Sequence, residues 1–353
     1  MAQNRDEAEA TGRSPTSHDV AAVAGVSQPT VSRALRGDPR VTPSTQRRVA
    51  DAATKLGYIP SERGRSLSTR RTRRVGVVVD DLSNPFYLQL LDALHREFGD
   101  NEHRMLVFTS ETGDRDSADR LVDGSIDGAV LTTTLIGSSL PSELRRRGFP
   151  FVLLNREIDG MEADTCVADN VAGGRRVAEE LARLGHRRVG AILGPANTST
   201  GRDREAGLRA GLAEWDLALP DDRLRRGDFS FTTGHRGMLE LLDMPRRPQA
   251  VFCANDVVAI GALNAAHSHG VAIPDELTVI GFDDIEMAAW EVFGLTTVRQ
   301  NIERMARTAA RLLVGRIADP SQPARRVVLA ADLVLRRTHG PPAPPKRRGP
   351  IRG

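Results

Sequence analysis

The sequence predicts a small all-α headpiece followed by a larger α/β body of two lobes, each built on a parallel sheet. Residues 19–56 repeat apolar side chains at three- and four-residue spacing, the period of an amphipathic helix. From residue 74 onward, short continuous apolar runs alternate with stretches of helical period, which is typical of parallel strands covered by helices on both faces. At roughly 265 residues the body is too long for one sheet, so we expect two doubly wound lobes.

Residues 19–35 are expected to form two short helices joined by a tight turn. Gly25 can adopt the positive φ that a sharp turn requires. Ser27 stands at the N-cap position of the second helix, where its hydroxyl can accept a backbone N–H, and Pro29 falls in the first helical turn, where a missing N–H costs nothing. A third helix is expected over residues 43–56, because apolar residues recur there at helical spacing.

The second of these helices has one apolar and one polar face. The apolar stripe consists of Val31, Ala34 and Leu35, and the polar face consists of Gln28, Thr30, Ser32 and Arg33. Two helices joined by a glycine turn, the second with a hydrogen-bonding face, are typical of a helix-turn-helix that reads DNA. An ordinary helical hairpin with a solvated face is the alternative, and the third helix favours the DNA-binding headpiece.

Charge is distributed unevenly along the chain, although the net charge is only +3. Residues 1–74 contain fourteen Arg and Lys against seven Asp and Glu, a net charge of +7, so the remainder carries −4. A basic N-terminal module on an acidic body indicates a nucleic-acid binder with a separate second function, whose binding depends strongly on salt. Residues 60–74 form the linker: either a disordered basic segment, or one that folds on the duplex and uses Leu67 as an apolar wedge.

Composition excludes several other classes of protein. No apolar run approaches the length of a membrane span, and the polar N-terminus lacks the apolar core of a signal peptide, so we expect a cytoplasmic protein without a membrane partner. Cys166 and Cys253 lie far apart and are expected as small core residues in a reducing compartment rather than as a disulfide. Their spacing does not fit a metal site, and no metal or cofactor is predicted.

Polar side chains recur where the predicted strands of the body end. Because ligands of doubly wound folds bind at the carboxyl ends of the strands, these side chains are expected to face a common site. They are Asp80, Asp81, Asn155, Arg156, Asp169, Asn170, Asn255, Asp256, Asp283 and Asp284. With aromatic residues nearby they suit a polyhydroxylated or heterocyclic metabolite held by bidentate hydrogen bonds. Each residue alone is more often a cap or a turn residue, and it is their recurrence that favours a binding site.

These motifs carry a family resemblance. DVAAVAGVSQPTVSRALRG and VTPSTQRRVADAATKLGYIPS in the headpiece, and VGVVVDDLSNPFYLQLL, CANDVVAIGAL, VIGFDDIE and LTTVRQ in the body, resemble the LacI/GalR family of bacterial transcriptional regulators. The resemblance covers nearly all of residues 18–338. It implies a headpiece over 17–59, a hinge helix within 60–74, and an effector-binding and dimerisation domain over 75–338 that resembles a type I periplasmic binding protein.

The resemblance also implies how the chain divides between the two lobes. Three crossovers are expected, near residues 168–171, 297–301 and 323–327. The N-terminal lobe then consists of about 75–168 and 301–323, and the C-terminal lobe of about 169–297 and 327–338. The two chain ends, residues 1–16 and the Pro/Gly-rich basic tail 339–353, are expected to be disordered.

Functional positions follow from the resemblance residue by residue. The positions expected to contact the DNA major groove and phosphates are Ser27, Gln28, Pro29, Thr30, Ser32 and Arg33, and Leu67 matches the hinge leucine that opens the central base step. Pro29 has no donor, so it can offer only van der Waals contact. The positions expected to line the effector pocket are Phe86, Tyr87, Asn155, Arg156, Asp169, Arg202, Phe229, Asn255 and Asp283. Arg156 and Arg202 would donate to hydroxyls, and the aromatic residues would stack on a ring.

The function expected is that of a homodimeric repressor that binds a palindromic operator, double-stranded DNA, under the control of a small effector, most readily a sugar. A purine-type corepressor uses many of the same positions and remains the alternative within this class. Acidic pairs at strand ends would also suit Mg²⁺ in a phosphoryl-transfer enzyme, but no phosphate-binding glycine loop, nucleophile elbow or zinc-protease motif occurs. A transport binding protein would need export. We therefore expect no enzyme activity.

Overall fold

The computed structural model describes residues 15–58, 71–109 and 114–342, except for the side chains of residues 114–116. The chain forms two compact units, Met1–Thr72 and Arg73–Gly353. The predicted hinge wedge Leu67 lies outside the described residues. No helix in the described part is long and apolar enough to span a membrane.

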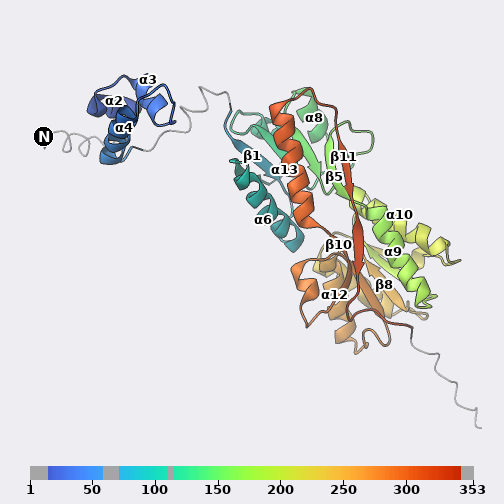
Figure 1. Ribbon diagram of the computed structural model, residues 1–353. Helices are drawn as coiled ribbons and strands as arrows, with labels where there is room; N and C mark the ends of the chain where they lie inside the picture. The colour runs from blue at the N-terminus through green and yellow to red at the C-terminus, as the bar shows by residue number, and fades with distance from the viewer. Residues whose placement is uncertain (1–14, 59–70, 110–113, 343–353) are drawn as a thin grey trace, which may run out of the picture. The chain divides into compact units, whose positions relative to one another are not determined.

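The first unit is a three-helix headpiece, as predicted (Figure 1). Its helices are α2 (Ser17–Ala24), α3 (Gln28–Ala34) and α4 (Pro43–Leu56). A capping box begins α2: the Thr16 hydroxyl accepts the Asp19 backbone N–H, and the Asp19 carboxylate accepts the Thr16 N–H in return. Thr16 is therefore part of the headpiece and not of a disordered N-terminus. Gly25 closes α2 with φ of 62°, the left-handed conformation expected for the turn.

Small apolar side chains form the headpiece core. Val20, Val31 and Val49, one from each helix, are completely buried, and five buried alanines let the helices approach closely. At the start of α4 the Thr42 hydroxyl accepts the Thr45 N–H, and Gly57 ends the helix at φ of 63°. The unit thus holds α3 rigidly by its apolar stripe and leaves its other face open.

The second unit contains two six-stranded sheets. The first sheet is parallel throughout, in the order β11 (Arg326–Leu329), β5 (Asp164–Ala168), β4 (Phe151–Leu154), β3 (Gly128–Leu131), β1 (Arg74–Val78), β2 (Arg104–Phe108). The second has the order β12 (Ala331–Val334), β10 (Thr296–Gln300), β9 (Thr278–Asp283), β8 (Ala250–Cys253), β6 (Val189–Leu193), β7 (Leu224–Arg226), with only β12 antiparallel. The prediction of two parallel-sheet α/β lobes is confirmed.

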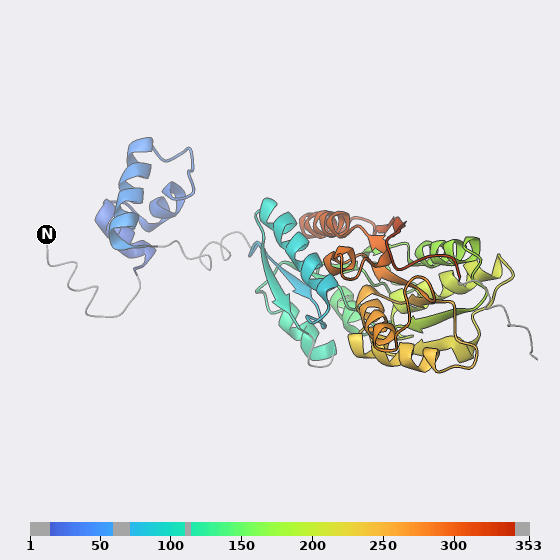
Figure 2. The same ribbon diagram turned by 90° about the horizontal axis from the view of Figure 1, so that it is seen from below.

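Helices cover both faces of each sheet. In the first lobe α6 (Pro85–Asp100) packs on α13 (Ile302–Ala318), and α7 (Asp114–Leu121) on α8 (Leu140–Arg146). In the second lobe α9 (Asn170–Arg183) packs on α10 (Ser199–Ala213) and α11 (Phe231–Leu242) on α12 (Asp256–Ser268), one pair on each side of the sheet (Figure 2). Two short 3₁₀ helices, Asp221–Arg223 and Glu286–Ala289, complete the second lobe. Cys166 and Cys253 are buried and free, so the prediction that they are core residues is confirmed.

The chain passes between the lobes three times. It leaves the first sheet after β5, returns from β10 into α13, and crosses again between β11 and β12. The third crossing corrects the predicted position near residues 323–327. Val327–Leu329 pair in parallel with β5 of the first sheet, so the chain enters the second lobe only after Leu329.

The C-terminal segment is docked on the second lobe as far as Gly340, which corrects the prediction of a disordered tail from residue 339. The Gly340 N–H donates to the Thr278 hydroxyl at 3.1 Å. The buried His186 ring donates from Nε2 to the Gly340 carbonyl oxygen at 2.8 Å. Its Nδ1 is buried and has no hydrogen-bond partner among the described residues.

Protonation of His186 is therefore expected to weaken the fold. Burial lowers the pKa of this histidine below its ordinary 6.5. The unfolded chain takes up the proton first, so the stability from neutral His186 is complete above about pH 6.5 and is lost as the pH falls through the lower folded value. The melting temperature should fall between pH 7.5 and 5.5 more steeply for the wild type than for His186→Gln. Equal slopes would show that His186 does not titrate differently in the folded state.

Candidate functional site

In the headpiece, α3 presents its polar face to solvent. Val31 and Ala34 are buried, whereas Ser27, Pro29 and Arg33 are exposed. The exposed side chains thus lie on the face opposite the core, where a DNA groove can reach them.

Hydrogen bonds fix part of this face. Ser27 occupies the N-cap of α3, but its hydroxyl caps no backbone N–H, contrary to the prediction; it bonds the Thr30 hydroxyl at 2.8 Å. Gln28 donates from Nε2 to the Ser17 hydroxyl at 3.2 Å, which ties α3 to the start of α2. The half-buried Gln28 is therefore oriented before it meets a ligand.

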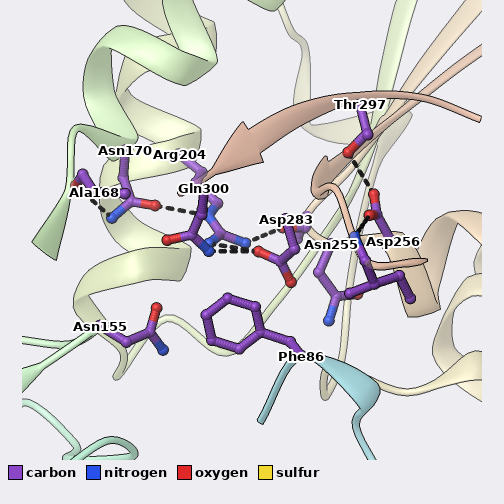
Figure 3. A network of polar contacts seen from close by, with 12 residues as sticks. Phe86, Asn155, Ala168, Asn170, Arg204, Asn255, Asp256, Asp283, Thr297 and Gln300 are labelled. Atoms are coloured by element: carbon purple, nitrogen blue, oxygen red, sulfur yellow. Dashed lines mark hydrogen bonds and ion pairs between the residues drawn. The ribbon is translucent and has the colours of Figure 1, made fainter. Parts of the chain in front are cut away.

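In the body, a buried polar network is centred on Arg204 of α10 (Figure 3). Its guanidinium donates to Asn170 Oδ1 at 2.8 Å, to the Ala254 carbonyl oxygen at 2.6 Å and to Asp283 Oδ1 at 3.0 Å. It also stacks over the Phe282 ring, 3.8 Å from the centroid. Every partner belongs to the second lobe, and each lies at or just beyond the carboxyl end of a strand.

Asp283 joins this network to the strand β10, which leads into the second crossover. The Gln300 amide donates from Nε2 to Asp283 Oδ1 at 2.7 Å. Burial raises the pKa of Asp283, and the neighbouring Arg204 charge and these hydrogen bonds oppose that rise. Burial also disfavours the charged form of Arg204, and for this cationic group the effect is to lower the pKa. The two groups compensate each other's loss of hydration, which is the condition for burying an ion pair.

The first lobe contributes a second cluster. The Tyr87 hydroxyl accepts from Arg156 Nη2 at 3.2 Å and from Asn155 Nδ2 at 3.4 Å. Phe86 packs edge-on against Tyr87 with ring centroids 5.3 Å apart. In Figure 3, Phe86 and Asn155 lie on the side opposite the Arg204 network, so side chains of both lobes face one another.

Three buried polar atoms in the described part have no hydrogen-bond partner at this junction: Asn155 Oδ1, Arg156 Nε and Gln300 Oε1. An unsatisfied buried polar group costs about 1–3 kcal/mol, so each requires an explanation. Asn155 and Asp283 also have positive φ, 69° and 116°, a conformation that non-glycine residues rarely adopt. Strain and unmet hydrogen bonds that coincide in one place indicate a ligand-binding site rather than a structural core.

Acidic residues near this junction are engaged by the protein itself. Asp256 is completely buried; its carboxylate accepts the Ile285 N–H at 2.9 Å and the Thr297 hydroxyl, and burial raises its pKa. Asp284 accepts from Arg299 and Arg336. The described residues contain no group of three or more His, Cys, Asp or Glu placed to hold a metal ion.

Comparison with known proteins agrees with this architecture. Residues 16–61 match the sequence profile of the family described as bacterial regulatory proteins, lacI family, and residues 178–339 match that of a periplasmic binding protein-like domain. The transcriptional regulator CelR of Thermobifida fusca is 32% identical over 333 residues, which cover 92% of this chain and 98% of that protein. The ribose operon repressor of Escherichia coli K12 is 32% identical over 329 residues, which cover 91% and 98%.

The chain belongs to the lacI family of bacterial regulatory proteins. Among solved structures, the CelR–cellobiose complex resembles it over 92% of this chain and 99% of the other, at 31% sequence identity and a TM-score of 0.72. The protein is thus a LacI-family transcriptional regulator with a DNA-binding helix-turn-helix, and not an enzyme.

Most of the pocket positions predicted from the sequence lie at the junction of the lobes in this LacI-family body. Asn255 lies at the start of α12, where its side chain caps Val258 N–H at 2.9 Å, and Asp169 caps α9 through Ala172 N–H at 2.9 Å. The half-buried Phe229 approaches the first lobe, its ring centroid 5.7 Å from the Arg156 guanidinium carbon.

Arg202 requires a correction. It is predicted to line the effector pocket and donate to hydroxyls, but its side chain forms ion pairs with Asp159 and Asp203. Arg204 is the arginine that belongs to the buried network. Residues two apart on a helix point in different directions, so Arg204 enters the buried network while Arg202 points to the exposed rim of the junction. The sequence predictions also missed Gln300, although it ends the LTTVRQ motif that contributed to the family resemblance.

Proposed function

We propose that this LacI-family regulator is a homodimeric repressor that binds a palindromic operator through α3 and responds to a small polyhydroxylated effector, of the sugar class, bound between its lobes. One observation carries the proposal of an effector site: Asn155, Arg156 and Gln300 present unpartnered buried polar atoms beside the Arg204–Asp283 network. Two of the three atoms are acceptors and one is a donor. A hydroxyl group can satisfy either kind, because it both donates and accepts.

The relatives support the sugar class. One is named for the ribose operon, and another was solved in complex with cellobiose. The Phe86 and Phe229 rings would lie against the faces of a pyranose or furanose ring. A purine nucleoside offers a ribose and a flat ring to the same groups, so it is the second ligand class to be tested.

Control of DNA binding would follow from two arrangements of the lobes. Effector binding shifts the equilibrium between them by its difference in affinity for the two, and only that difference changes operator occupancy. The three crossover segments are the places where such a change must be absorbed. Gln300 lies at one of them and contacts Asp283 of the effector site, which makes it the direct connection between ligand and crossover.

Thermal-shift measurements on the full-length protein test the effector assignment. Ribose, cellobiose and adenosine are added at millimolar concentration, and a ligand specific for the folded state raises the melting temperature by mass action. A shift that Asn155→Gly abolishes supports the site, since glycine adopts the positive φ freely and removes only the side chain. A shift that this variant retains, or no shift with any of a wider panel of sugars, contradicts the proposal.

Arg33 is expected to contribute a specific contact to the operator. Arg33→Ala should lower specific operator affinity by about 1–3 kcal/mol, which is the value of one good base contact. The effect is measured by fluorescence anisotropy on a palindromic fragment upstream of the regulator's own gene and on a scrambled fragment. Arg48→Ala on α4 is the control for lost charge. If Arg33→Ala lowers the affinity for both DNA fragments equally, Arg33 contacts only phosphates.

A further inference from the structure

Among the described residues, three hydrogen-bonded contacts join the two lobes beside the effector site. The Glu157 N–H donates to the Ser199 hydroxyl at 3.0 Å. The Arg202 guanidinium forms a bidentate ion pair with Asp159, in which Nη2 donates to Oδ1 at 3.1 Å and Nη1 donates to Oδ2. The third contact is between the backbones, from the Ile136 N–H to the Asn197 carbonyl oxygen at 2.9 Å.

Each contact runs from the first lobe to the second. Residues 136, 157 and 159 lie in the segments that follow β3 and β4 of the first sheet. Residues 197, 199 and 202 lie between β6 of the second sheet and the first turns of α10. The contacts of Glu157 and Asp159 therefore bridge the same two segments that carry the effector site: Asn155 and Arg156 directly precede residue 157, and Arg204 lies two residues after Arg202 on α10.

The ion pair lies at the rim of this junction. The side chains of Arg202 and Asp159 are 36% and 68% exposed, whereas those of Arg204 and Asp283 are 3% and 6% exposed. Asp203 accepts from Arg202 Nε at 2.8 Å and so orients the guanidinium toward Asp159. An exposed pair contributes little to stability, so this one can open and close within the native state.

We propose that Arg202 and Asp159 are positioning residues, whose ion pair holds the lobes in the arrangement that brings Asn155 and Arg156 to face the Arg204 network. The consequence for effector affinity rests on the proposed function, but the arrangement of the lobes does not. Opening the pair lets α10 and the segment after β4 separate. Arg202 then acts on the effector through lobe geometry and not by touching it.

Spin-label distance measurements test this without any ligand. Labels are placed by Ser142→Cys on α8 of the first lobe and Ser268→Cys on α12 of the second, both at exposed positions. The native thiols stay unlabelled because Cys166 and Cys253 are completely buried. Labelled chains are mixed with an excess of unlabelled protein, so that any dimer that carries labels carries them on one copy only.

Arg202→Ala should lower the ratio of molecules at the main interlobe distance to molecules at other distances by about two- to fivefold. This is the change in a two-state ratio that the free energy of an exposed ion pair can produce. Asp159→Ala and the double variant should give the same change as Arg202→Ala, because each removes the same contact. Arg202→Lys and the charge exchange Arg202→Asp with Asp159→Arg should restore most of the main population. Arg175→Ala is the matched control, since Arg175 pairs with Glu214 within the second lobe at similar exposure.

Three results would overturn the inference: unchanged distances in Arg202→Ala, an additive effect in the double variant, or an equal change in Arg175→Ala. The same experiments distinguish a failure of the positioning role from a failure of the proposed function. If the distances respond as expected but ribose, cellobiose and adenosine do not bind, the positioning pair stands and the effector class is wrong. If a sugar binds but the distances do not respond, the effector site stands and the positioning role fails.

Discussion

Replacing Arg204 by alanine should destabilise the body by about 3–5 kcal/mol, the usual effect of removing one partner from a buried ion pair. The Asp283 carboxylate would lose its cation, and Asn170 Oδ1 and the Ala254 carbonyl oxygen would each lose a donor. The change is measured as the free energy of unfolding in urea, monitored by circular dichroism on the full-length protein. Effector binding should be lost as well, since Asp283 and Gln300 lose their fixed positions.

The control for this variant is Arg175→Ala. Arg175 also extends from a second-lobe helix to a carboxylate, that of Glu214, but the two side chains are 51% and 52% exposed. Its removal should change the free energy of unfolding by less than about 1 kcal/mol. Similar effects of Arg204→Ala and Arg175→Ala would contradict a buried, charge-dependent network.

Gly207→Ala should also have a large effect, because α9 and α10 approach closely at this glycine. A Cβ atom at position 207 would lie 2.1 Å from the Val171 carbonyl oxygen, a backbone atom that cannot move aside without its helix. We expect a loss of about 1–3 kcal/mol or more in the free energy of unfolding. The separated helices carry Arg204 and Asn170, so effector binding should weaken even where the variant folds.

Gly99→Ala provides the matched control. Gly99 lies in α6, where an added Cβ meets no atom within 4 Å. Alanine has the higher helix propensity, so this substitution should leave the protein unchanged or stabilise it by up to about 1 kcal/mol. Equal destabilisation by the two substitutions would mean that helix packing at Gly207 has no special importance.

Much of the fold could be predicted because continuous apolar runs mark the central strands. Phe151–Leu154 and Val189–Leu193 begin and end where their apolar runs do. The third crossover was misplaced for a different reason. The residues of β11 show that they form a strand, but only their pairing with β5 shows which sheet they join. That choice depends on tertiary contacts and is absent from the local pattern.

The site could be predicted to the level of strand ends, but not to that of individual side chains. Asn155 directly follows β4, Asn255 lies two residues after β8, and Asp283 is the last residue of β9. The rule that ligands bind at the carboxyl ends of strands in doubly wound sheets therefore predicts all three. The choice between Arg202 and Arg204 depends on the rotation of α10 about its axis, which the spacing of polar residues did not determine. Thr16 could have been found, because a threonine three residues before an acidic residue is the pattern of a capping box.

The central claim is that a ligand in the interlobe site controls DNA binding by the headpiece. The direct test is operator affinity, measured by fluorescence anisotropy on full-length protein with the sugar or nucleoside that gives the largest thermal shift. For the wild type we expect this ligand to change operator affinity at least about tenfold, within the range of allosteric coupling. In Asn155→Gly the ligand should have no effect, while affinity without ligand stays at the wild-type value. A ligand effect of the same size in Asn155→Gly, or no effect in the wild type, would contradict the claim.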